Sequence, residues 1–441
     1  MPSRFAQASP RHVFRALGVR NFRLFAGGQV LSVTGTWMMI VAQDWLVLGM
    51  TDRPGPVLGL VTALQFVPLA LFMLYGGRLA DRHDKRLLLI GANSVSAVLG
   101  LVMAGLVLSG QITIWQICVF AFAVGTVNAL EVPTRMSFVS ELVGPALLPN
   151  ASALSSAYFN IARVAGAALA GVLIAGVGEG WVLVLNALSY AFSVAGLARI
   201  RVGELHRSSV RPRDGIRAGL RYVAGRRDLL SPIALVAVIG LFALNFQLTL
   251  PLLAKTVFSA DAGEFGLLSA ALAVGSLVSA FVTTARTSRP PARLVCLSAV
   301  ALGVAELAAG LAPTFGSAMM LLAVVGFTSM YFAQAANHRI QLGSDPQYRG
   351  RVLALYSLIL QGTTPLGALV IGWVSEGHGA RWGLYLGGVA ALVAGVVGLV
   401  HERTQRYRVD DVPDPGGSST LDLPEPEENR RELAPPMRRM P

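Results

Sequence analysis

GRLADRHDKR, residues 77–86, carries six formal charges between two long apolar runs, 57–75 and 87–108. A charged side chain at the centre of a bilayer costs about 2.5–3.5 kcal/mol or more, so this stretch cannot lie in hydrocarbon. Each flanking run is long enough to cross a membrane as a helix. The stretch therefore predicts a tight, hydrated turn between two membrane-spanning helices.

The composition of the whole chain also indicates a membrane protein. Of its 441 residues, 54% are hydrophobic and only 14% are charged, and the mean hydropathy is +0.60. Soluble globular proteins carry about 25% charged residues. The formal charge of +12 does not indicate a nucleic-acid partner, because the arginines alternate with apolar spans and form no groove-sized basic patch. We expect an all-α membrane protein embedded in the lipid bilayer.

No pattern in the sequence indicates an enzyme, a metal or a cofactor. Cys118 and Cys296 lie in apolar runs, where packing is their expected role. The His, Cys and carboxylate residues do not cluster with metal-ligand spacing, and the sequence lacks a nucleophile elbow and a phosphate-binding loop. We therefore expect a non-enzymatic protein without a cofactor.

Apolar spans of about 20 residues recur along the chain and predict twelve transmembrane helices. The expected spans are 22–48, 56–76, 87–109, 112–132, 152–177, 181–199, 230–255, 264–285, 293–311, 315–337, 351–375 and 381–400. The first is too long for the apolar core of a signal peptide and should be uncleaved.

The basic residues predict the orientation of the chain. Every second loop is rich in them, and the segment 199–227 alone holds nine arginines, whereas the intervening loops hold only Arg53, Lys255 and Arg381. Because basic residues accumulate on the cytoplasmic side, both termini should be cytoplasmic. The expected parts are an amino-terminal segment (1–21), a first six-helix bundle (22–199), a central loop (200–229), a second bundle (230–401) and a disordered tail (402–441).

The two halves of the chain contain an internal repeat. A shift of 201 residues aligns 145–185 with 346–386 and pairs Gly166 with Gly367, Gly171 with Gly372, Gly178 with Gly379 and Trp181 with Trp382. A shift of 207 pairs Gly59 with Gly266, Arg82 with Arg289 and Arg86 with Arg293. Two homologous six-helix halves related by an axis along the membrane normal are typical of transporters that work by alternating access.

The charged stretch resembles motif A of the major facilitator superfamily, Gly-x-Leu-Ala-Asp-Arg-x-x-Lys-Arg, which lies between the second and third helices. The likeness is to bacterial twelve-helix drug and siderophore exporters of the enterobactin-exporter type. It implies the major facilitator fold, with 12 transmembrane helices in two pseudo-symmetric six-helix halves, a monomer, and a place in a bacterial inner membrane. Here Asp84 stands where the family usually has glycine.

The resemblance also implies a cytoplasmic latch that favours the outward-facing state. In the family, the acid of motif A lies against the start of the eleventh helix and the basic residues pair with an acid at the end of the fourth. The latch residues implied here are Gly77, Asp81, Arg82, Lys85, Arg86, Glu131 and Arg135. Without the resemblance, a solvated turn that fixes the topology is the better explanation of the same residues.

Three ionisable residues fall inside expected spans, and such residues are functional candidates by default. Asp44 is the candidate proton-coupling carboxylate, unless it lies at the hydrated outer interface. Arg163 could bind an anionic substrate, pair with Asp44 or tie helices together. Glu306 is a weaker candidate. Around Arg163, the run 163–171 resembles the glycine-rich motif of family antiporters, with Ala167 in place of its proline.

Neutral polar residues and one tryptophan are candidates for the lining of a substrate cavity, although each could instead bond to a neighbouring helix. They are Trp37, Gln43, Asn128, Asn160, Asn245, Gln247, Gln334, Asn337 and Gln361. Together with the resemblance, they predict a secondary transporter that exports a small amphipathic molecule, with protons as the coupling ion. The alternatives are an importer of a neutral metabolite and a non-transporting membrane scaffold or sensor.

Overall fold

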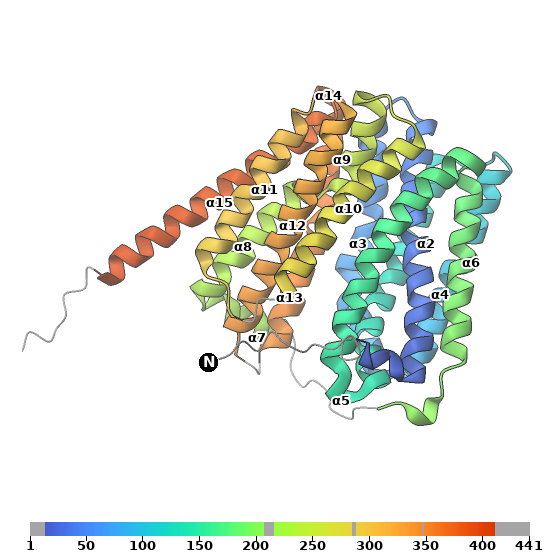
Figure 1. Ribbon diagram of the computed structural model, residues 1–441, viewed down its shortest axis with the longest axis horizontal. Helices are drawn as coiled ribbons and strands as arrows, with labels where there is room; N and C mark the ends of the chain where they lie inside the picture. Colours follow the sequence, from blue (N-terminus) through green and yellow to red (C-terminus); the bar gives the residue numbers. More distant parts are fainter. Residues whose placement is uncertain (1–13, 207–215, 285–287, 346–347, 411–441) are drawn as a thin grey trace, which may run out of the picture.

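The computed structural model describes residues 14–206, 216–284, 288–345 and 348–410, and within these ranges it is almost entirely helical (Figure 1). The first half contains η1 (Arg15–Gly18), α2 (Arg20–Met50), α3 (Pro54–Arg82), α4 (Lys85–Leu108), α5 (Ile114–Val177) and α6 (Glu179–Ala198). The connection that follows contains η2 (Val202–Glu204) and α7 (Ile216–Ala224). The second half contains α8 (Arg227–Phe242), α9 (Phe246–Leu252), η3 (Leu253–Val257), α10 (Ala262–Thr284), α11 (Ala292–Gly310), α12 (Phe315–Gly343), α13 (Arg349–Gly362), α14 (Thr364–His378) and α15 (Arg381–Asp410).

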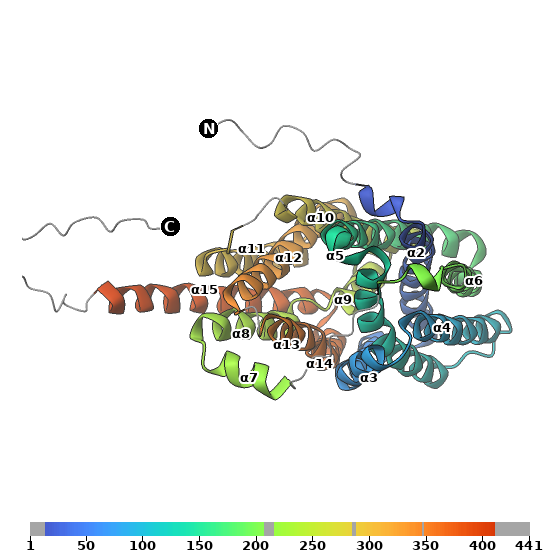
Figure 2. The same cartoon turned by 90° about the horizontal axis from the view of Figure 1, so that it is seen from below.

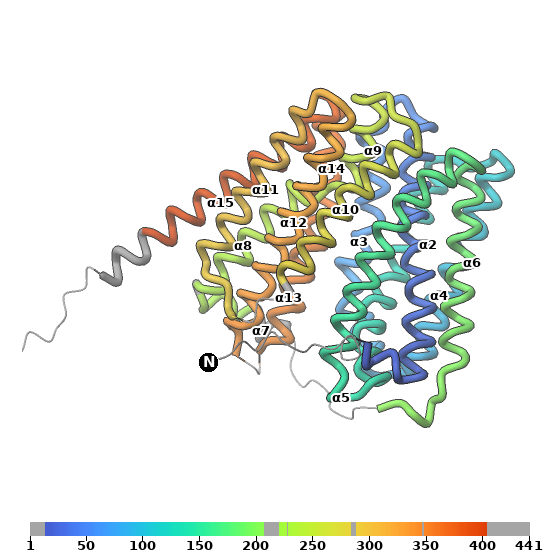
Figure 3. The backbone as a smooth tube through the Cα atoms, viewed as in Figure 1, coloured from blue at the N-terminus to red at the C-terminus, as the bar shows by residue number. Residues whose placement is uncertain are grey.

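The helix α5 accounts for two of the expected crossings. Its 64 residues would extend about 96 Å if straight, roughly three times the thickness of the hydrocarbon core. Gly144 interrupts the helix with φ 71° and ψ 174°, a conformation that glycine adopts without steric cost, and the chain folds back there (Figure 3). In the described part of the chain, eleven helical segments are long and apolar enough to cross a membrane. With α5 crossing twice, they confirm the twelve crossings expected.

The helices extend further than the apolar spans predicted. The predicted turn at residues 77–86 is reduced to His83 and Asp84, because α3 continues to Arg82 and α4 begins at Lys85. A 29-residue helix is about 44 Å long, so its last turns reach water or headgroups without leaving helical geometry. The prediction of a ten-residue turn was therefore wrong. Most of motif A is the end of a helix.

The helices form two bundles (Figure 2), which converge at one end of the molecule and diverge at the other (Figure 1). The diverging end carries the charged end of α3, η2 and α7, and we call it the arginine-rich end. The two halves meet mainly through α3 against α14 and α5 against α10. These two pairs occupy equivalent places in the repeat and form the main joint between the bundles.

Close approach of glycines seals the end opposite to the arginine-rich end. A Cβ on Gly372 of α14 would lie 2.5 Å from the carbonyl oxygen of Gly55 and 3.3 Å from the Cα of Gly59 on α3. A Cβ on Gly171 of α5 would lie 3.0 Å from the Cα of Gly266 on α10. Such contacts between helix backbones are possible only with very small side chains. We refer to Gly59–Gly372 and Gly171–Gly266 as the glycine contacts.

The glycine contacts confirm the internal repeat in three dimensions. Gly59 and Gly266 are repeat mates, and so are Gly171 and Gly372, so each contact joins one member of each pair. A further pair, Gly178 and Gly379, ends the helices α5 and α14 with φ of 84° and 100°. The two halves are therefore pseudo-symmetric, as the sequence predicted.

Three of the expected parts lie partly outside the described residues: positions 1–13 of the amino-terminal segment, 207–215 of the central loop and 411–441 of the tail. Within the rest of the central loop, α7 packs on α13. The ring of Tyr222 stacks on that of Tyr348 with centroids 4.3 Å apart, and Arg226 lies over the Tyr222 ring. The helix α15 continues to Asp410, beyond the span expected for it.

Candidate functional site

A cavity of about 1090 Å³ lies between the two halves, on the side of the arginine-rich end. The first half supplies residues of α5, and the second supplies residues of α10 and α12. Most of the wall is apolar, with Met136, Phe159, Leu277, Phe281 and Met330 among its residues, and its polar members include Arg135, Tyr158, Asn160, Gln334 and His338. The volume and the mixture of lining groups suit a small amphipathic ligand.

Three of the predicted residues meet at the wall of this cavity. Arg163 of α5 donates from Nη2 to Oδ1 of Asn160 at 3.1 Å, and its guanidinium lies 5.8 Å from the ring centroid of Trp37 on α2. Trp37 in turn contacts Phe159, which lines the cavity, in an edge-to-face arrangement. The Nε atom of Arg163 is buried without a hydrogen-bond partner among the described residues. The cluster thus leaves one donor of a cationic group unused close to the cavity.

A second cluster of predicted residues lies on the α5 wall. Glu131 and Arg135, one turn apart, form an ion pair at 3.4 Å. Nη1 of Arg135 also lies 3.5 Å from Oε1 of the buried Gln29 on α2. Because Arg135 lines the cavity, this pair places a partly neutralised charge where a ligand would bind.

Asp44 is buried on α2, in the half of that helix nearer the sealed end. Across the ranges that the structure describes, its carboxylate forms no hydrogen bond or ion pair with another side chain. Gln43, the preceding residue, is also buried. The alternative of a hydrated interfacial carboxylate is at odds with this burial, whereas the proton-coupling role stays a prediction.

The other predicted cavity residues are dispersed. Of the neutral polar set, Asn160 and Gln334 line the cavity. Asn245 lies between α8 and α9, Gln247 lies on α9, and Asn337 bonds to Tyr356. Asn128 and Gln361 are half-buried on α5 and α13. The cavity therefore gathers a minority of the candidates.

The start of α4 is joined to other helices of the first half by three contacts. Lys85 forms an ion pair with Glu141, near the end of the first crossing of α5. Arg86 donates to the carbonyl oxygens of Leu197 and Ala198, each at 2.7 Å, and so caps the last turn of α6. These contacts tie the basic end of motif A to its own bundle.

Other members of the expected latch are unengaged in this conformation. Asp81 and Arg82 are exposed, and no ion pair of theirs is found within the described ranges. A Cβ on Gly77 would meet open space, whereas one on Gly76 would lie 2.1 Å from the Ala129 carbonyl oxygen. Gly76, which the sequence analysis did not select, therefore permits the close approach of α3 to α5. Contact of Asp81 with the eleventh crossing stays a prediction for the state closed at this end.

Asp84, the departure from the family motif, is the N-cap of α4. Its Oδ1 accepts hydrogen bonds from the backbone N–H groups of Arg86 and Leu87, at 2.9 and 3.2 Å. Replacing an aspartate N-cap by alanine costs about 0.5–2 kcal/mol, but replacing it by glycine costs only a few tenths. We expect Asp84→Ala to lower the melting temperature of the purified protein clearly, and Asp84→Gly to lower it little. Equal losses in both variants would contradict the capping role.

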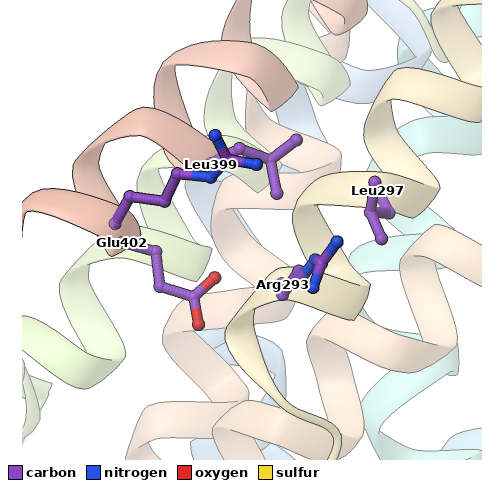
Figure 4. Close-up of a pocket in the computed structure, with 5 residues that line it drawn as sticks. Arg293, Leu297, Leu399 and Glu402 are labelled. Carbon is purple, nitrogen blue, oxygen red and sulfur yellow. The ribbon is translucent and has the colours of Figure 1, made fainter. Parts of the chain in front are cut away.

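The second half has its own ionic cluster at the arginine-rich end. Asp228 forms ion pairs with Arg226 at 2.9 Å and with Arg289 at 3.0 Å, and Arg289 is the repeat mate of Arg82. The hydrogen bonds from Arg226 to Asp228 raise the pKa of the Arg226 guanidinium above its usual value. A separate pocket of about 240 Å³, lined by Arg293, Leu297, Leu399, Glu402 and Arg403, lies at the ends of α11 and α15 (Figure 4). It is lined by the second half alone and is too small for the expected substrates.

Sequence reasoning missed two residues that take part in these sites. Glu141 was overlooked because the fourth span was expected to end at 132, which left Glu131 as the terminal acid. His338 lies one turn after Gln334 on the same cavity-facing side of α12, and that spacing was a usable signal.

Comparisons with known proteins agree with the fold and the cavity. A family model described as transmembrane secretion effector, within the major facilitator superfamily, matches residues 13–419. The multidrug efflux pump Tap of Mycobacterium tuberculosis is 26% identical over 365 residues, which cover 79% of this chain and 86% of that protein. Macrolide efflux protein A of Streptococcus pyogenes is 23% identical over 403 residues, which cover 87% and 96%.

Among solved structures, an inward-facing, unoccupied bacterial homologue of the human lysosomal transporter Spinster has a TM-score of 0.71. It is 15% identical, and the likeness covers 91% of this chain and 99% of that one, so it shows a shared fold. The family model covers most of the sequence, and the fold, the internal repeat and motif A agree with it. The chain therefore belongs to the transmembrane secretion effector family of the major facilitator superfamily.

Proposed function

We propose that the protein is a secondary transporter that exports small amphipathic molecules by alternating access, using protons as the coupling ion. The observation that carries this proposal is the cavity of about 1090 Å³ between two pseudo-symmetric halves. The cavity lies toward the arginine-rich end, while the glycine contacts hold the halves together at the opposite end. Rocking of the halves about a central cavity is how parallel-repeat transporters expose a site to each side in turn.

Several contacts besides the glycine contacts support the sealed end. Nε of Arg53 lies 3.6 Å from Oε1 of Glu376, across the two halves. Trp45 of α2 stacks on Phe265 of α10. Nζ of Lys255 lies 4.9 Å from the centroid of the Trp45 ring. The positive-inside rule supports a cytoplasmic arginine-rich end, and with that orientation we propose that this conformation is the inward-open state.

Relatives and the composition of the cavity wall support export as the direction of transport and amphipathic molecules as the substrate class. The relatives include a multidrug efflux pump, a macrolide efflux protein and the staphyloferrin A transporter of Staphylococcus aureus. An apolar wall with a few amides, hydroxyls and a half-neutralised arginine favours ligands with a hydrophobic body and a polar handle. We therefore place drugs and secondary metabolites of that kind ahead of strongly anionic metabolites.

Cysteine labelling tests the proposed state and orientation. In a variant lacking Cys118 and Cys296, a cysteine replacing Ser156 in the cavity should react with an impermeant maleimide in everted vesicles. A transported drug should slow that reaction severalfold, because it occupies the same space. As the matched control, a cysteine replacing the exposed Ser109, at the sealed end, should react only in intact cells.

Two results would contradict the proposal. Labelling at position 109 from the everted side would invert the topology and with it the direction of transport. If no drug in a panel protects position 156 and none accumulates in everted vesicles, the results would favour a non-transporting membrane protein.

A further inference from the structure

Glu306 is a buried carboxylic acid that the transport pathway described above does not use. It lies on α11, is 1% exposed, and neither of its carboxyl oxygens has a hydrogen-bond partner among the described residues. An isolated carboxylate in such surroundings is strongly disfavoured and normally becomes neutral by taking up a proton. The carboxyl group of Glu306 therefore needs a proton or another cation, which its contacts in this structure do not supply.

The carboxyl group of Glu306 lies against the end of another helix. A Cβ on Gly387 of α15 would lie 2.5 Å from Oε2 of Glu306, 2.9 Å from the carbonyl oxygen of Phe242 and 3.0 Å from the Cα of Ala243. The acid and the last residue of α8 thus face one small space, which exists because position 387 has no side chain. A protonated carboxyl has an O–H group to donate, and the Phe242 carbonyl oxygen borders the same space.

This carbonyl belongs to a break in the seventh crossing. The regular helix α8 ends at Phe242, and α9 begins at Phe246. Inside the break, Nδ2 of Asn245 donates to the Leu241 carbonyl at 2.8 Å, and its Oδ1 is buried without a partner in the described part of the molecule. The last carbonyls of a helix lack intrahelical donors, so Phe242 offers a free acceptor beside Glu306.

The charged and titratable groups on the helices packed around α11 lie away from Glu306. On α15, Arg381 is six residues from Gly387 and Glu402 is fifteen, about 9 Å and about 22 Å along the axis. The nearer Tyr385 donates its hydroxyl to the Gly310 carbonyl. Asp228 is at the far end of α8, and His338 and Arg339 are near the end of α12. No cation within the described ranges neutralises Glu306, which leaves a proton as the fitting ligand.

We infer that Glu306 is a proton-binding site, at which the neutral carboxyl donates a hydrogen bond to the end of α8. When the break between α8 and α9 opens to water, the O–H bond of the carboxyl breaks and the proton passes to water. Glu306 then serves the second half as Asp44 is proposed to serve the first. The motion in this inference rests on the proposed transport cycle, but its test does not require transport.

Infrared difference spectroscopy on the full-length protein in lipid nanodiscs tests this site. Between mildly acidic and mildly alkaline buffer, the wild type should lose a protonated-carboxyl C=O band that shifts in heavy water. In Glu306→Gln, the decrease of the band should be smaller by the amount that one carboxyl per chain contributes. In Asp44→Asn, the contribution of Glu306 to the decrease should remain. Glu306→Asp, which keeps an acid, should show the band at a shifted frequency and guards against misfolding of the glutamine variant.

Three outcomes would overturn the inference. Identical difference spectra for the wild type and Glu306→Gln would mean that Glu306 does not exchange its proton. The same holds if Glu306→Asp shows no titrating band although it elutes as a folded protein. Loss of the band on adding sodium chloride at constant pH would assign a metal cation instead. A titrating Glu306 band in a protein that moves no drug would retain this inference and reject the proposed function.

Discussion

Replacing Gly372 by alanine is expected to keep the outer end of the protein from closing and to lower export about tenfold or more. The added Cβ would lie 2.5 Å from the carbonyl oxygen of Gly55, and a backbone atom cannot swing away as a side chain can. Overpacking of this kind costs about 1–3 kcal/mol. Each 1.4 kcal/mol is about tenfold in population, so the inward-open state should become minor.

The chain offers matched controls for this prediction. Gly377 lies on the same helix as Gly372, but a Cβ there meets open space, so Gly377→Ala carries the same gain in helix propensity without the clash. Gly171 and Gly176 of α5 form the equivalent pair in the first half. Only Gly372→Ala and Gly171→Ala should lose export.

Electron paramagnetic resonance distances can separate a gating defect from misfolding. The distance between spin labels at the exposed positions Ser109 and Leu311, one on each half at the sealed end, should increase in Gly372→Ala and keep its wild-type value in Gly377→Ala. An unchanged distance together with normal export would remove the glycine contacts as the outer closure.

Replacing Asp44 by asparagine is expected to abolish uphill export driven by a proton gradient while leaving exchange of substrate across the membrane intact. Asparagine keeps the size and polarity of the side chain but cannot bind a proton. Each unit of pH difference supplies about 1.4 kcal/mol per proton, or about tenfold accumulation. The variant loses this contribution, so drug accumulation in energised everted vesicles should fall to the level without a gradient.

The control for this prediction is Asp52→Asn, which removes an exposed acid just after the same helix. Its accumulation should equal that of the wild type. Full gradient-driven accumulation by Asp44→Asn would show that the coupling proton binds elsewhere, and Glu306 would be the next residue to test.

The sequence was sufficient for the fold because the decisive signals are physical and repeated. Apolar spans, alternating basic loops and paired glycines predicted twelve crossings in two similar halves, and the structure has them. Helix ends were less accurate, because hydropathy marks where hydrocarbon ends and helices continue beyond it into polar surroundings. The choice of Glu131 over Glu141 as the terminal acid followed directly from that error.

The site was predicted only in part because it depends on contacts between distant helices. Spacing alone could place Asn160 beside Arg163, but not Trp37 of another helix over the same guanidinium. The residues between α8 and α9, where the helix breaks beside Glu306, include no proline. The local sequence therefore does not predict this break. Buried polar groups are identified one at a time in a sequence, whereas their partners become visible only in the packed protein.

In the glycine contacts, each glycine of one half meets the repeat mate of the other glycine of its own half. The joint between the halves is therefore isologous at these contacts. Gly59 and Gly171 of the first half are the repeat mates of Gly266 and Gly372 of the second, and each half contributes one glycine of each kind. Such a surface is self-complementary, as in a C2 homodimer. A single six-helix half therefore contributes both kinds of glycine that the two contacts require.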